Sequence, residues 1–227
     1  MSLDSNQLAT LRLWQLISPA LPVGAYAYSG GLESALHAEW LRNPRDVEQW
    51  ITGLLQHTLC HLDIPVLQRC YQAWTMADVE QVEYWSRFIL AARESSELYA
   101  EDLQLGRALA TLLSDLDIPE AQALRLSDNA PFVCLLALAG VKWCVPIDQL
   151  AAGWLWSWSE NQVAAAIKLM PLGQTAGQKM LMNIARVIPN AVAIGLTLDD
   201  EDIGAMAAGL GIASAWHETQ YSRLFRS

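Results

Sequence analysis

Two histidines and a cysteine are spaced as neighbours on one face of a helix. His57, Cys60 and His61 stand at positions i, i+3 and i+4, and imidazole and thiolate groups are common ligands of transition metals. No second Cys or His cluster in the sequence has the spacing that would complete a coordination shell. We therefore favour a partly buried helix face on which these side chains only pack, and keep the three as weak metal candidates.

A run of four acidic residues suggests a different chemistry. Asp199 to Asp202 is similar to the aspartate-rich magnesium motifs of all-α prenyl synthases, but Ile203 stands where the last Asp of that motif belongs. No second acidic motif of this kind is found in the sequence. The acidic residues are better explained as an N-cap and first-turn charges of a helix over residues 199–215. An all-α, magnesium-dependent enzyme of the isoprenoid type remains a minor alternative.

The segment from Gly173 to Lys179 has the residue types of a phosphate-binding loop without its spacing. A P-loop reads G-x-x-x-x-G-K-[ST] and follows a strand. Here Gly177 comes one residue early, Met180 follows the lysine, and no strand is predicted before it. No G-x-S-x-G motif and no cysteine with an identifiable base is found either. The sequence predicts no catalytic site and no cofactor, and it favours an interaction protein.

Composition excludes further classes of protein. Of the 227 residues, 53% are hydrophobic and only 17% are charged, so the chain is not disordered. A formal net charge of −10 without a Lys/Arg cluster argues against nucleic-acid binding. The longest apolar run, residues 130–141, is too short to cross a bilayer. Four cysteines without a C-x-x-C pair, and no recognisable signal peptide, lead us to expect a cytoplasmic protein that no membrane holds.

Helical periodicity runs through nearly the whole chain. Asn43-Pro44 predicts the start of one helix, and Asp78 with Gln81 resembles the capping box of another. Apolar spacing predicts further helices, among them one over residues 149–168 and one over 175–188. No strand pair and no internal repeat is recognised. We expect an all-α fold in which residues 1–227 form a single domain, a bundle of roughly ten helices with short loops.

Two stretches do not fit the bundle pattern. The first is a loop rich in Gly, Pro and Tyr over residues 21–33, and the second is the tail, residues 216–227. In the tail, Tyr221, Leu224 and Phe225 have the i, i+3, i+4 spacing of one helical face. Such a segment either folds back onto its own core or becomes ordered on a partner, and the sequence leaves both alternatives open.

Three stretches, taken together and in order, resemble the UreF family of urease accessory proteins. They are residues 21–33, 160–178 and 217–227, so the resemblance extends over the whole chain. Met170 and the second glycine of Gly30-Gly31 are small departures from the family pattern. The resemblance implies an all-α protein, often a homodimer, that has no established catalysis of its own.

In that family, the accessory protein joins UreD (also called UreH) and the GTPase UreG. The assembly docks on urease apoprotein and drives the GTP-dependent insertion of nickel into its active site. The resemblance therefore implies a role as a chaperone of urease maturation and metallocentre assembly. A direct nickel carrier that uses the histidine–cysteine face is a second alternative, beside the isoprenoid-type enzyme.

The resemblance also suggests where the partners bind. It places regulation of the GTPase near Glu33, Lys168 and Gln174, although Glu33 and Lys168 could instead pair with each other or cap helices. It places the docking of UreD in the tail, on seven side chains: His217, Glu218, Tyr221, Arg223, Leu224, Phe225 and Arg226.

Overall fold

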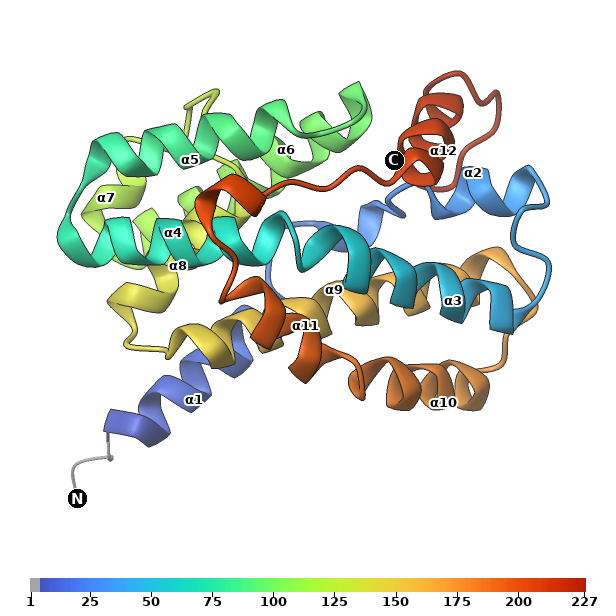
Figure 1. Cartoon of the computed structure of the whole chain (residues 1–227), viewed down its shortest axis with the longest axis horizontal. Helices are drawn as coiled ribbons and strands as arrows, with labels where there is room; N and C mark the ends of the chain where they lie inside the picture. Colours follow the sequence, from blue (N-terminus) through green and yellow to red (C-terminus); the bar gives the residue numbers. More distant parts are fainter. Residues whose placement is uncertain (1–4) are drawn as a thin grey trace.

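Helices make up the regular structure of residues 5–227, which are the residues that the computed structural model describes, and no β-strand is found among them (Figure 1). The prediction of an all-α fold is confirmed. The first half of the chain contains α1 (Ser5–Leu16), α2 (Leu32–His37), α3 (Pro44–Leu54), α4 (Asp63–Met76), α5 (Val79–Ala91) and α6 (Ser96–Asp115). The second half contains α7 (Pro119–Gln122), α8 (Phe132–Lys142), α9 (Ile147–Leu169), α10 (Gln174–Ala185), α11 (Ile188–Gly195) and α12 (Ala208–Glu218). Short 3-10 turns cover Ala25–Ala27 and Asp200–Asp202, and a π-helical segment, Leu55–Leu59, follows α3.

Local capping sets the helix starts that the sequence predicted. The Asn43 side chain accepts hydrogen bonds from the backbone N–H groups of Arg45 (2.9 Å) and Asp46 (3.1 Å) at the start of α3. Asp78 likewise accepts from the N–H of Gln81 (3.1 Å) at the start of α5. Both side chains satisfy donors that the first turn of a helix leaves free.

Two predicted helices have the wrong limits. The helix expected over residues 199–215 begins only with α12, because the chain turns away at Gly204, where φ is +151°. The N–H of Gly204 donates instead to the carbonyl of His61 (2.9 Å). The helix expected over residues 175–188 ends at Ala185, and α11 begins at Ile188 with Pro189 in its first turn.

The apolar core lies around α4 and α8. Every residue of α8 from Val133 to Gly140 is buried, and α8 packs against α4, α5 and α6. Long helix α9 contacts α2, α3, α10 and α11 and so joins the core to the other half of the molecule. No helix in the described part of the chain is long and apolar enough to cross a membrane.

The tail lies at one end of the molecule. Figure 1 shows α12 beside α2, with the last residues of the tail returning toward α2. Helix α12 packs against both α2 and α6. Three helices far apart in the sequence therefore meet at the tail.

Candidate functional site

The loop of residues 21–33 and the tail are hydrogen-bonded to each other. The N–H and the hydroxyl of Ser29 both donate to the carbonyl oxygen of Ser227, at 2.9 and 2.5 Å. In return, the N–H of Arg226 donates to the carbonyl of Ala27 (2.8 Å). Two of the three stretches that carry the family resemblance thus form one unit.

Helix α9, which contains the first half of the remaining stretch, residues 160–178, contacts the same unit. Asn161 donates from Nδ2 to the carbonyl of Tyr28 (3.1 Å) in the loop. From farther along α9, the ammonium of Lys168 lies 5.4 Å from the centre of the Phe225 ring, a cation–π contact. Loop, helix and tail are therefore assembled around a single place.

Glu33 holds the tail through its backbone. One carboxylate oxygen accepts the N–H of Leu224 (2.7 Å), and the other accepts the N–H of Phe225 (2.9 Å). Only 8% of Glu33 is exposed. Hydrogen bonds to a charged acceptor contribute about 1.5–3 kcal/mol each, so this side chain is a strong anchor for a segment that has no helical hydrogen bonds of its own.

A second glutamate, Glu97 at the start of α6, contacts two basic side chains of the tail. Its Oε2 lies 2.7 Å from Nδ1 of His217, and its Oε1 accepts from Arg223 (2.8 Å). His217 is fully buried, and its other ring nitrogen lies 3.3 Å from the carboxylate of Glu33. We call this group the clasp: Glu33, Glu97, His217, Arg223 and the N–H groups of Leu224 and Phe225.

Beyond α12 the tail is not helical. Helix α12 ends at Glu218, whose carboxylate accepts from the N–H and the hydroxyl of Ser96. The expectation that Tyr221, Leu224 and Phe225 share a helical face is therefore wrong, because the backbone of this segment bonds to Glu33 and the loop. Phe225 is buried, whereas Tyr221 and Leu224 are exposed. The tail is folded back onto its own chain and still presents apolar side chains outward.

An aromatic pair that the sequence did not predict joins the first residue of the tail to the segment after α2. Trp40, which follows α2, and Trp216, in α12, have ring centres 5.1 Å apart, and both are more than a third exposed. We call the four exposed side chains Trp40, Trp216, Tyr221 and Leu224 the apolar face of the tail region. The ten tryptophans of the sequence are a signal for such a face, but nothing in their spacing pairs these two.

The other residue proposed for the GTPase contact lies elsewhere on the surface. Gln174 is the first residue of α10 and is exposed. Lys168 is exposed as well, whereas Glu33 is buried beneath the tail. Glu33 and Lys168 do not cap a helix end with their side chains; they meet through Phe225.

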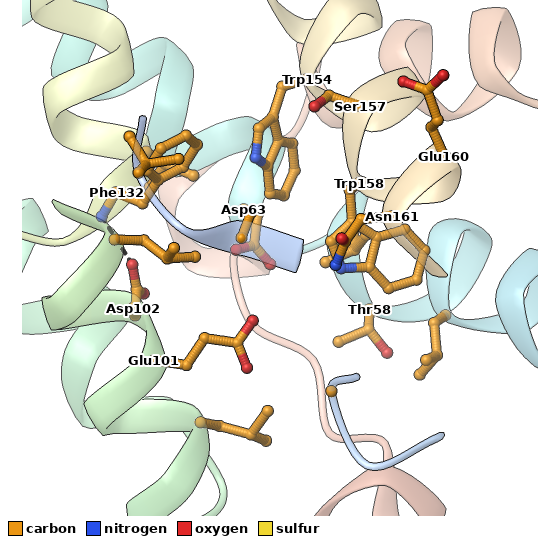
Figure 2. Close-up of a pocket in the computed structure, with 18 of the residues that line it drawn as sticks. Thr58, Asp63, Glu101, Asp102, Phe132, Trp154, Ser157, Trp158, Glu160 and Asn161 are labelled. Carbon is orange, nitrogen blue, oxygen red and sulfur yellow. Dashed lines mark hydrogen bonds between the residues drawn. The ribbon is translucent and has the colours of Figure 1, made fainter. Parts of the chain in front are cut away.

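A cavity of about 360 Å³ lies behind the loop. Figure 2 shows the carboxylates of Asp63 and Glu101 among its lining side chains, together with the indole rings of Trp154 and Trp158. Burial raises the pKa of Glu101 to about 7, although the hydrogen bond from the Ser227 hydroxyl lowers it. The cavity is therefore mainly apolar, and one of its acids can change charge near neutral pH.

A buried charged group forms one edge of this cavity. Arg93 donates to Asp63 (2.7 Å) and to Asp102 (2.8 Å), and Asp102 also accepts the N–H of Phe132 (2.7 Å), drawn in Figure 2. Burial raises the pKa of Asp63 against the lowering effect of Arg93. Because a half-paired buried ion is costly, this group fixes α6 against the start of α4 and α8.

The three weak metal candidates are not arranged as a ligand set. Cys60 is buried, and its thiol contacts the carbonyl of Gln56 and Nδ1 of His61, both at 2.9 Å, while His57 is exposed. Burial raises the pKa of Cys60 to about 11, so at neutral pH it is a thiol and not the thiolate that metals and electrophiles require. Among residues 5–227, no group of three or more His, Cys, Asp or Glu side chains could hold a metal ion.

The other chemical motifs have structural roles. Asp200, in its 3-10 turn, forms an ion pair with Arg69 (2.7 Å), and the acidic run caps no helix. The glycine-rich segment from Gly173 contains the first turns of α10, and no strand precedes it within the described chain.

The fold and the site together define a class of protein. Its charged side chains hold the chain's own loop and tail, and aromatic side chains stand exposed beside them. The class is an all-helical protein whose most elaborate site is the attachment of its own tail.

Comparison with known proteins identifies the family. The family model UreF matches residues 41–185. The chain is 51% identical to the urease accessory protein UreF of Alkalilimnicola ehrlichii, with both chains covered completely. It is 50% identical to that of Teredinibacter turnerae, over 98% of this chain and 100% of the relative, and 46% identical to that of Hahella chejuensis, over 97% and 99%. The chain belongs to the UreF family of urease accessory proteins.

Proposed function

We propose that the chain is a non-catalytic scaffold for the maturation of urease. It binds UreD (UreH) and the GTPase UreG, and the assembly docks on urease apoprotein for the GTP-dependent insertion of nickel. It works in the cytoplasm as a homodimer. Membership of the UreF family supports this role.

One observation supports the proposal that UreD docks on the tail. The clasp holds the backbone of the tail through Glu33, while the side chains of Tyr221 and Leu224 stay exposed, as do those of Trp40 and Trp216. A segment fixed in advance loses little conformational freedom on binding, and aromatic side chains are enriched at protein interfaces. The apolar face is thus suited to a protein partner, and Arg223 and Arg226 of the same segment are exposed as well.

Glu33 and Lys168 act differently on the GTPase in this proposal. Glu33 is buried, so it acts through the position of the tail, whereas Lys168 and Gln174 are exposed and contact UreG directly. A scaffold changes the nucleotide cycle of its partner only by binding one nucleotide state more tightly, by about 1.4 kcal/mol for each tenfold bias.

Co-expression with UreD and UreG, followed by size-exclusion chromatography, tests the docking face. We expect the double variant Tyr221→Ala, Leu224→Asp to lose co-elution with UreD, because its apolar face is removed while Glu33 still binds the backbone. Leu126→Asp is the matched control, since Leu126 is 92% exposed and remote in sequence from the clasp. Unchanged co-elution of the double variant would show that the tail face does not dock UreD. Light scattering on the same column measures whether the chain is a dimer.

A further inference from the structure

His217 lies between two acidic side chains that come from different helices. Its Nδ1 is 2.7 Å from Oε2 of Glu97 on α6, and its Nε2 is 3.3 Å from Oε2 of Glu33 on α2. The ring is fully buried. Bulk solvent therefore does not reach either nitrogen.

Both acids accept hydrogen bonds from other donors. Glu33 accepts two backbone N–H groups, from Leu224 and Phe225. Glu97 accepts from the guanidinium of Arg223. Donors of this kind favour the carboxylate over the carboxylic acid, so His217 faces two negative charges.

A neutral imidazole cannot satisfy this environment. It carries one N–H, and its other nitrogen presents a lone pair, which here would point at a carboxylate oxygen. Only the doubly protonated ring donates on both sides. We infer that His217 is held as an imidazolium, and that the clasp is a proton-linked latch, complete when His217 carries both protons and loosened when one is lost.

The charges around the ring support this inference. Helix α12 packs against α2 and α6; α2 contributes Glu33, α6 contributes Glu97, and the tail contributes Arg223. With an imidazolium, these two anions and two cations balance; with a neutral ring, one buried negative charge is left without compensation, which is unfavourable.

Further titratable groups lie on the same helices, among them His37 on α2, Glu101 and Asp102 on α6, and Glu218 on α12. His37, at the end of α2, is exposed. Glu101, one turn beyond Glu97 on α6, binds the hydroxyl of Ser227 (2.6 Å), and as it ionises it adds negative charge that favours the imidazolium. The experiment must therefore separate His217 from Glu101.

Nitrogen NMR of the full chain tests the protonation state directly. The four histidines of the sequence give separable imidazole signals, and the signal lost in His217→Gln identifies this ring. We expect two N–H groups on His217 at about pH 7. A single tautomer, with one nitrogen showing a free lone pair at that pH, would overturn the inference. The assignment can instead be made by elimination with His37→Gln, His57→Gln and His61→Gln if the His217 variant does not fold.

Amide exchange against pH tests the latch. After correction for the intrinsic rate, the opening of the Leu224 and Phe225 amides should increase by up to about tenfold for each pH unit between the pKa of a free imidazole, about 6.5, and the pH at which the latched ring loses its proton, and should be constant above that pH. His37→Gln and Glu101→Gln should keep this dependence, and His217→Gln should lose it. Opening that is independent of pH up to about pH 9 in the unmodified protein, or unchanged dependence in His217→Gln, would refute the latch. The inference goes beyond the proposed function, since neither measurement needs a partner.

Discussion

The region around α4 and α8 and the region around the tail are stabilised by different kinds of contact. Around α4 and α8, contact is apolar and continuous, with Leu67, Leu135 and Leu138 fully or almost fully buried. Around the tail, the contact consists mainly of hydrogen bonds from and to charged groups, and Phe225 is the one buried apolar side chain beyond α12.

Because of this difference, the core determines the stability of the fold, and the contacts of the tail determine how the tail responds to a change of protonation. Apolar burial is roughly proportional to area and has no dependence on protonation. A segment held by a few charged hydrogen bonds opens at lower cost than the global unfolding of the protein. The core therefore sets whether the chain is folded, and the clasp sets whether the tail lies in place.

The largest effect is expected where the core allows no added atom. A Cβ at Gly106 of α6 would lie 1.8 Å from the carbonyl oxygen of Ala130, so Gly106→Ala should lower the free energy of unfolding by about 3 kcal/mol or more. Gly53→Ala in α3 is the matched control, because a Cβ there meets nothing within 4 Å and should stabilise by about 0.5–1 kcal/mol. Chemical denaturation measures both; equal effects would contradict the packing of α6 against the segment before α8.

Loss of the Glu33 carboxylate should affect the tail more than the core. Glu33→Ala leaves the N–H groups of Leu224 and Phe225 without their acceptor, at a cost of about 2 kcal/mol in tail opening. Glu80→Ala is the control, since Glu80 is also a first-turn glutamate but is exposed. Limited proteolysis should cut the tail of the Glu33 variant first, while the core remains folded. Equal resistance of the two variants would show that Glu33 is not the anchor.

Glu101 should make stability depend on pH. Its folded-state pKa is raised to about 7 from a usual value near 4.5. The contribution of the protonated Glu101 to the free energy of unfolding is therefore fully present below about pH 4.5 and is lost as the pH rises through about 7. Glu101→Gln should remove this loss and be more stable than the unmodified protein at pH 8, by about 1.5 kcal/mol after solvent screening. Denaturation at pH 5 and pH 8 measures the difference; an identical pH response would contradict the assignment.

The smallest effect on stability is expected at Lys168. Its contact with the Phe225 ring contributes about 0.5–1 kcal/mol, so Lys168→Glu should remain folded. Binding of UreG and the activation of urease should nevertheless change, with Lys179→Glu on α10 as an exposed control. If Lys168→Glu leaves both partner binding and activation unchanged, its proposed role is wrong.

The sequence predicted the features that depend on interactions between residues close together in the chain, such as the starts of capped helices. Asn43 and Asp78 cap helices through residues two or three positions away, so their signals lie within a few residues of each other. The start of α12 was not predictable in this way, because Gly204 bonds to His61 at the junction between α3 and α4. That contact belongs to the tertiary structure.

The same limit applies to the site. The sequence singled out Glu33, Lys168 and the tail, but not that all three meet at Phe225. The pairing of Trp40 with Trp216 joins residues from opposite ends of the chain. The i, i+3, i+4 spacing in the tail wrongly suggested a helix, because a buried carboxylate takes the backbone donors that a helix would use.

The exchange of two amides at a single pH tests the central claim, that the chain holds its own tail in place through Glu33. In the full chain without partners at about pH 7, the amides of Leu224 and Phe225 should exchange at least about 100-fold more slowly than in an unstructured peptide. Exchange of both amides at the unstructured rate would contradict the account, because the tail would then not be held before a partner binds.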